Sequence, residues 1–144
     1  MDHRAAPLTE PAQSRSFRLR LLPERLAVAR LSGTAAVPAW ADGPGVVSIT
    51  RRTDELSIVC AETRVPSGIR AERGYRALEV EGPIPFEEVG VVHALTGPLA
   101  AERISVLTIA TYDTDLLLVR EETLARACAA LQEAGHRVVG GRGT

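Results

Sequence analysis

The 144-residue chain contains no lysine and no asparagine, and all 17 of its basic side chains are arginine. Schiff-base chemistry, a lysine general base and a Walker-type phosphate loop each need a lysine ammonium, so the sequence excludes all three. The 18 acidic side chains leave a formal net charge of -1. A sequence-independent nucleic-acid binder needs a net basic face, so the near-zero charge argues against this class, and we expect no nucleic-acid partner. Arginine without lysine is typical of a GC-rich genome and carries little functional information.

Aromatic side chains and long apolar runs are also scarce. Only 3% of the residues are aromatic although 45% are hydrophobic, so we expect a core of leucine, valine, isoleucine and alanine. No apolar run approaches the roughly 18 residues that span a bilayer. The two cysteines, Cys60 and Cys128, form no CxxC motif and predict small core residues in a reducing compartment. Residues 1–16 lack the apolar stretch of a secretory signal and predict a disordered tail. We expect a cytoplasmic protein that does not contact membranes.

Hydrophobic periodicity predicts strands and two helices after residue 16. The first strand is expected to be interrupted at Pro23. The expected strands are Arg18–Leu21, Glu24–Leu31, Val46–Thr50, Glu55–Cys60, Tyr75–Glu81, Ile104–Ala110, Asp115–Val119 and His136–Val139, and the expected helices are Glu87–Arg103 and Glu121–Ala134. From Tyr75 the order is β-α-β-β-α-β, which is the ferredoxin-like order of an antiparallel sheet with two helices on one face. The first half repeats this order with short pieces in place of the helices.

A sequence repeat favours duplication over chance likeness. Residues 56–62 (LSIVCAE) resemble residues 116–122 (LLLVREE) at a spacing of 60, and the acidic turns before them are alike. We therefore predict an α+β protein with a degenerate N-terminal module over residues 17–74 and a C-terminal module over residues 75–140.

The sequence shows no recognisable catalytic or metal-binding apparatus. The three histidines (His3, His93 and His136) have no metal-ligand spacing with other residues, and we expect structural or surface roles for them. The acidic pairs 87–88 and 121–122 open predicted helices, where carboxylates are favoured by the helix dipole. No G-x-S-x-G motif is present, and both cysteines lie in hydrophobic patterns. We expect a protein that is not an enzyme and that uses no cofactor or metal.

Two segments depart from a purely structural pattern. In residues 87–92, Gly90 lets a ligand approach a helix start, where free amides suit a carboxylate. Residues 111–115 (TYDTD) pack hydroxyls and carboxylates into a turn, and we expect the strand before this turn to lie beside the strand that leads to the first helix. The two segments could then bind the two charges of a zwitterion. Alternatively, Gly90 eases packing and the acids only shape a turn. The residues alone favour neither interpretation.

A family resemblance rests on four segments taken together: residues 22–28 (LPERLAV), 53–59 (TDELSIV), 81–86 (EGPIPF) and 111–119 (TYDTDLLLV). In this order and spacing they resemble the small bacterial tandem-ACT proteins, which are similar to halves of the animal arginine sensor CASTOR. The resemblance covers roughly residues 17–139.

This resemblance implies two ACT modules of ferredoxin-like fold, the first with shortened helices, and no catalysis. It implies a small amino acid bound at an interface between ACT modules, often completed by dimerisation. We therefore expect a homodimer that reports this amino acid to an unidentified protein partner. Carried over by position, backbone contacts come from Val89, Gly90 and Val91, and further contacts come from Thr111, Thr114 and Asp115. The family usually has a serine at the position of Ala110, so one hydroxyl contact is lost. The alternative is an ACT-type dimerisation or protein-interaction module without a ligand.

Overall fold

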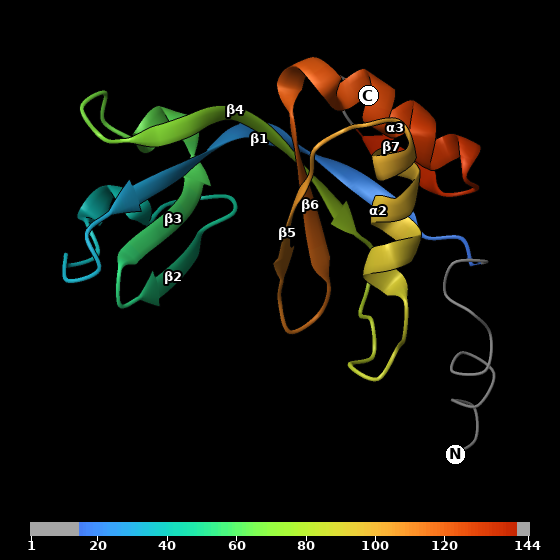
Figure 1. The fold of residues 1–144 in the computed structure, drawn as a ribbon, viewed down its shortest axis with the longest axis horizontal. Helices are drawn as coiled ribbons and strands as arrows, with labels where there is room; N and C mark the ends of the chain where they lie inside the picture. The colour runs from blue at the N-terminus through green and yellow to red at the C-terminus, as the bar shows by residue number, and fades with distance from the viewer. Residues whose placement is uncertain (1–14, 141–144) are drawn as a thin grey trace.

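In a computed structural model of the chain, the described part covers residues 15–140, and most of the expected tail lies outside it. The described residues form one seven-stranded sheet with two α-helices (Figure 1). The strands are β1 (Arg18–Leu31), β2 (Ser48–Arg52), β3 (Glu55–Ala61), β4 (Ala71–Val80), β5 (Leu107–Ala110), β6 (Asp115–Arg120) and β7 (Arg137–Gly140), the helices are α2 (Val91–Ala101) and α3 (Leu124–Glu133), and single 3₁₀ turns cover Ala39–Ala41, Glu62–Arg64 and Glu121–Thr123. The expected order β-α-β-β-α-β is present from β4 to β7.

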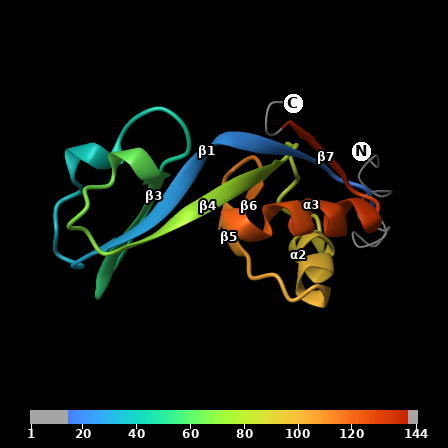
Figure 2. The same ribbon diagram turned by 90° about the horizontal axis from the view of Figure 1, so that it is seen from above.

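Two long strands join the halves of the molecule. The sheet order is β2-β3-β1-β4-β6-β5, and β7 pairs with β1. The N-terminal half of β1 lies between β7 and β4, whereas its C-terminal half lies between β3 and β4. The predicted antiparallel pairing is present in every described strand pair except β1–β7, which is parallel. The prediction of one sheet in each module is corrected, because β1 and β4 run through both halves and make a single sheet (Figure 2). The expected boundary between residues 74 and 75 falls within β4.

The repeated segments occupy corresponding places in this sheet. β3 begins at Glu55 and β6 at Asp115, each pairs with a partner in a hairpin, and each runs into a 3₁₀ turn. Both hairpins lie on the same side of the β1–β4 ribbon (Figure 1). The duplication itself stays a prediction.

Pro23 does not interrupt the first strand. β1 is continuous, and its register against β4 shifts between Leu21 and Arg25. A bulge tolerates proline because the residue there need not donate to the ladder. The guanidinium of Arg76 donates to the carbonyl of Leu22 at 3.1 Å, so the irregular segment keeps a hydrogen bond.

Both helices are shorter than predicted. α2 begins only at Val91 because Gly90, with φ of 85°, cannot continue a right-handed helix. Pro98 lies inside α2 and lacks the amide that would bond the carbonyl of Ala94. The buried His136 ring meets this carbonyl through Nε2 at 3.3 Å, and its Nδ1 accepts the amide of Phe17 at 3.1 Å. His136 is therefore a structural residue, as predicted.

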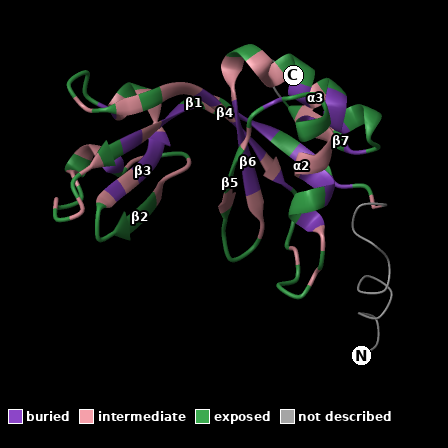
Figure 3. Cartoon of the chain, viewed as in Figure 1, coloured by how far each residue is buried: buried purple, intermediate pink, exposed green. Residues whose placement is uncertain are grey.

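Buried side chains form three clusters. Figure 3 marks in purple the buried residues along the strands and helices. The first lies between the sheet and the two helices and includes Leu19 from β1. The second includes Leu26 and Leu118 and joins side chains of the β3 and β6 hairpins to β1 and β4. The third lies beneath the 3₁₀ turns of the N-terminal half and includes Cys60. Aliphatic residues dominate all three clusters, as the composition predicts.

Candidate functional site

A cleft lies between the start of α2 and the turn that joins β5 to β6. Its volume is about 330 Å³, within the usual range of small-molecule sites. The lining residues are Ile84, Pro85, Phe86, Glu88, Gly90, Val91, Val92, His93, Ala110, Thr111, Tyr112, Thr114 and Asp115. The sheet brings the two segments together because β6, the strand after the turn, pairs with β4, the strand that leads to α2. The expectation that the strand before the turn lies beside β4 is therefore wrong.

The start of α2 presents unpaired backbone donors to this cleft. The first intrahelical hydrogen bond runs from the amide of Ala94 to the carbonyl of Gly90, at 2.9 Å. The amides of Val91, Val92 and His93 precede it and meet no acceptor within residues 15–140. Three amides at the positive end of a helix form a favourable environment for an anion.

The turn opposite is held by its own threonines. The Thr111 hydroxyl donates to the carbonyl of Thr114 and accepts the Thr114 amide, both at 3.1 Å. The Thr114 hydroxyl donates to the carbonyl of Val80 at 2.6 Å, which ties the turn to the end of β4. Both hydroxyl protons are donated to backbone carbonyls of the protein. The two threonine oxygens can therefore accept hydrogen bonds from a ligand but not donate to it.

Asp115 supplies the negative charge of the cleft. It pairs with Ala110 at the end of the β5–β6 ladder, and its carboxylate has no hydrogen-bond or ion-pair partner among the described residues. Burial raises the pKa of this carboxyl above its ordinary value. A carboxylate that is partly desolvated without a counter-charge gains stability when a cation binds beside it.

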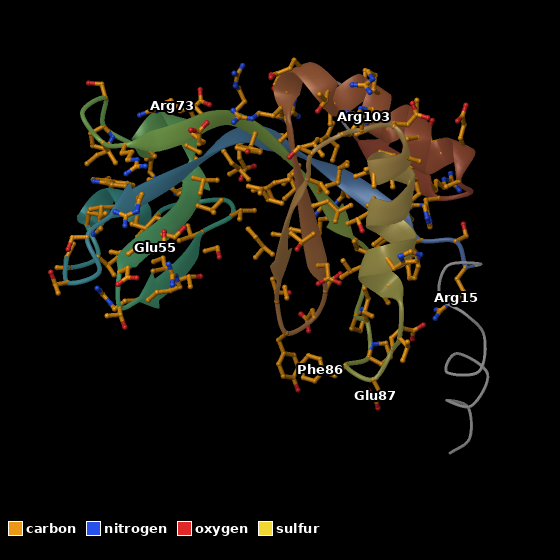
Figure 4. All side chains as sticks on the ribbon, in the orientation of Figure 1. Arg15, Glu55, Arg73, Phe86, Glu87 and Arg103 are labelled. Atoms are coloured by element: carbon orange, nitrogen blue, oxygen red, sulfur yellow. The ribbon has the colours of Figure 1, made fainter. Side chains whose placement is uncertain are left out.

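The loop before α2 is hydrogen-bonded to the β5–β6 turn. The amide of Ile84 donates to the carbonyl of Asp113 at 2.8 Å. A Cβ at Gly82 would lie 2.8 Å from that carbonyl, so this close approach requires glycine. The side chain of Glu88, which is 3% exposed, forms an ion pair with Arg15 from the start of the described chain. The labelled residues of this region are drawn in Figure 4.

The structure brings together five of the six residues predicted for the site: Gly90, Val91, Thr111, Thr114 and Asp115. Val89 does not line the cleft and is 75% exposed. Sequence reasoning missed the contribution of residues 84–86, whose only signal was the segment 81–86 of the family resemblance. It also missed Tyr112 as a lining residue, although the turn that contains it was singled out.

The described residues contain neither a metal-binding cluster nor a membrane-spanning helix. No group of three or more histidine, cysteine, aspartate or glutamate side chains could hold a metal ion within residues 15–140. Over the same residues, neither α-helix has the length and apolar character needed to cross a bilayer.

Comparisons with known proteins agree with this fold. Protein Atu0741 from Agrobacterium tumefaciens is 41% identical, with a TM-score of 0.83, over 87% of this chain and 93% of that chain. VC0802 from Vibrio cholerae, described as a possible transport protein, is 19% identical with a TM-score of 0.70, over 94% and 99%. The aspartate kinase of Clostridium acetobutylicum is 10% identical with a TM-score of 0.58, over 78% and 33%. The last two likenesses show the fold alone. No curated protein matches the chain.

Residues 70–133, which contain β4, α2, β5, β6 and α3, match the ACT domain family. A family described as an N-terminal domain matches residues 24–68. Fold and sequence therefore define an ACT-domain protein. Because identity to Atu0741 is 41% over almost the whole of both chains, this protein belongs to the same family as Atu0741. The narrower resemblance to CASTOR stays a prediction.

Proposed function

We propose that this protein is a cytoplasmic, non-catalytic regulator that binds a small α-amino acid in the cleft between α2 and the β5–β6 turn. One observation carries the proposal: the residues that hold three unpaired amides and one unpaired carboxylate line the same cleft. An α-amino acid carries a carboxylate and an ammonium on adjacent carbon atoms, so its two charges match this pair of groups.

The chemistry of each half of the cleft supports this assignment. The amides of Val91, Val92 and His93 suit the ligand carboxylate, because they are fixed by the helix and point their donors away from it. Asp115 suits the ligand ammonium, which would replace the water that burial has partly removed from its carboxylate. The ACT domain found in residues 70–133 and the likeness to an aspartate kinase described as allosteric are compatible with a regulatory role.

A thermal-shift screen against the twenty proteinogenic amino acids, followed by calorimetry, tests the proposal. A ligand at 100 times its dissociation constant adds about 2.7 kcal/mol to the free energy of unfolding, which is a shift of several degrees. Asp115→Asn should weaken binding at least tenfold. The matched control is Glu55→Gln, which removes the carboxylate at the corresponding position of β3, outside the cleft, and should leave affinity unchanged.

Two results would contradict the proposal. One is the absence of any shift with every amino acid at millimolar concentration. The other is binding that Asp115→Asn leaves intact. The first result would favour the alternative, a dimerisation or interaction module, for which the exposed Leu107 on the edge strand β5 is the specific observation. Sedimentation with and without amino acid measures whether a homodimer forms and whether the ligand changes it.

A further inference from the structure

Two aromatic side chains at the mouth of the cleft are unusually exposed. The chain has only five aromatic residues, namely one tryptophan, two tyrosines and two phenylalanines. Phe17 and Tyr75 are buried, as large apolar side chains of globular proteins usually are. Phe86 is 73% exposed and Tyr112 is 81% exposed, yet their rings meet edge to face with centroids 5.0 Å apart. Figure 4 shows Phe86 at the tip of the loop before α2.

A second cavity adjoins the cleft and is also lined by these two rings. It has a volume of about 300 Å³ and is lined by Pro83, Ile84, Pro85, Phe86, Tyr112 and Asp113. Four of these residues also line the first cleft, so the two spaces share a wall. An amino acid whose charged groups occupy the first cleft therefore has apolar surface within reach of its side chain.

The charges around both cavities favour a neutral side chain. Of the acids that line the first cleft, Glu88 is paired with Arg15. Asp115 is left to meet the ligand ammonium. Asp113 lines the second cavity but is solvent-exposed, and an exposed carboxylate contributes little to an ion pair. A cationic side chain would lose hydration against a mostly apolar wall without a buried partner, and an acidic side chain would meet carboxylates.

We propose that Phe86 and Tyr112 form the side-chain subsite of the cleft, and that the ligand is an α-amino acid with a large, neutral, apolar side chain. This inference rests on the proposed function and adds the ligand class to it. The two rings lose exposed apolar surface when such a side chain covers them, which explains why a chain poor in aromatics places two of them in solvent. The rings belong to the loop before α2 and to the β5–β6 turn, so the ligand would contact both segments at once.

Calorimetric titration of the full chain with L-phenylalanine, L-leucine, L-methionine, L-alanine, L-arginine and L-aspartate tests the ligand class. We expect each of the three large apolar amino acids to bind at least tenfold more tightly than alanine, because each buried methylene contributes roughly a fourfold factor. Arginine and aspartate should bind more weakly than leucine.

Variants of the rings test the subsite itself. Phe86→Ala and Tyr112→Ala should each weaken the binding of the large apolar amino acids about tenfold and leave alanine nearly unchanged. Tyr112→Phe keeps the ring and should bind as the wild type does. The matched control is Val89→Ala, because Val89 is equally exposed in the same loop but lines neither cavity. Circular dichroism verifies that each variant is folded.

The outcomes separate this inference from the proposed function. If no amino acid binds, both fail together. If alanine, arginine or aspartate binds as tightly as leucine and phenylalanine, amino-acid binding stands and the apolar subsite is refuted. The same conclusion follows if the ring variants weaken all amino acids equally, since the rings would then act on the cleft as a whole. Loss of affinity confined to the large apolar ligands supports the inference.

Discussion

Leu19→Ala tests whether the two halves of the sheet unfold as one unit. Leu19 is fully buried in the cluster beneath α2 and α3, but it belongs to β1, which also supplies the N-terminal half of the sheet. Because β1 and β4 pass through both halves, the loss of packing at one end should lower the stability of the whole chain.

The size of the effect follows from the burial of this side chain. Replacing a fully buried leucine by alanine costs about 2–5 kcal/mol, from lost transfer free energy and the cavity that remains. With a urea dependence of about 1.5 kcal/mol per molar for a small protein, the unfolding midpoint should fall by roughly 1–3 M. The slope should not change, since the same surface is exposed on unfolding.

Two probes report the two halves separately. Trp40 is the only tryptophan and packs against the cluster of the N-terminal half, so its fluorescence follows that half. Far-ultraviolet circular dichroism follows α2 and α3 in the other half. In Leu19→Ala both midpoints should fall together, and the reciprocal variant Leu56→Ala, in the cluster near Trp40, should do the same. A Trp40 midpoint that stays at the wild-type value while the helical signal shifts would refute the reasoning.

Two further predictions concern Asp115 and His136. Burial holds the pKa of folded Asp115 above its unfolded value, so the free energy of unfolding falls as pH rises through that window. Without ligand, Asp115→Asn should therefore have a higher melting temperature than the wild type at neutral pH. Below about pH 3 the carboxyl is protonated in both the folded and the unfolded state, so the two melting temperatures should be equal. A lower melting temperature of the variant at neutral pH would contradict this. His136→Leu leaves the Ala94 carbonyl and the Phe17 amide unpaired and should cost about 2–4 kcal/mol in urea unfolding. In a Pro98→Ala background the restored amide of residue 98 can donate to the Ala94 carbonyl, so His136→Leu should lower the free energy of unfolding by about 1 kcal/mol less than it does in the wild type. An equal loss in both backgrounds would show that the His136 ring does not bond this carbonyl.

Part of the candidate site was predictable because its residues depend on local rules. Gly90 is needed at a positive φ just before α2, and the threonines of residues 111–115 bond the backbone of their own turn. Turns that need glycine or short polar side chains can be predicted from the sequence alone. The place of Phe86 in the site could not be predicted from local patterns, because prolines and apolar residues are common in the loops that follow strands. Its place beside Tyr112 follows from the hydrogen bond between Ile84 and Asp113, which is a long-range contact.

The sequence by itself determined the alternation of strands and helices, the aliphatic core, the repeat of 60 residues and the two polar segments of the site. These follow from side-chain periodicity and from turn chemistry, which act over a few residues. Only the tertiary structure decided that β1 lies between β7 and β4, that one sheet serves both halves and that Arg15 meets Glu88. The reason is physical: strand pairing and ion pairs join residues far apart in the chain, and a local pattern fixes which face of a strand is buried but not which strand lies beside it.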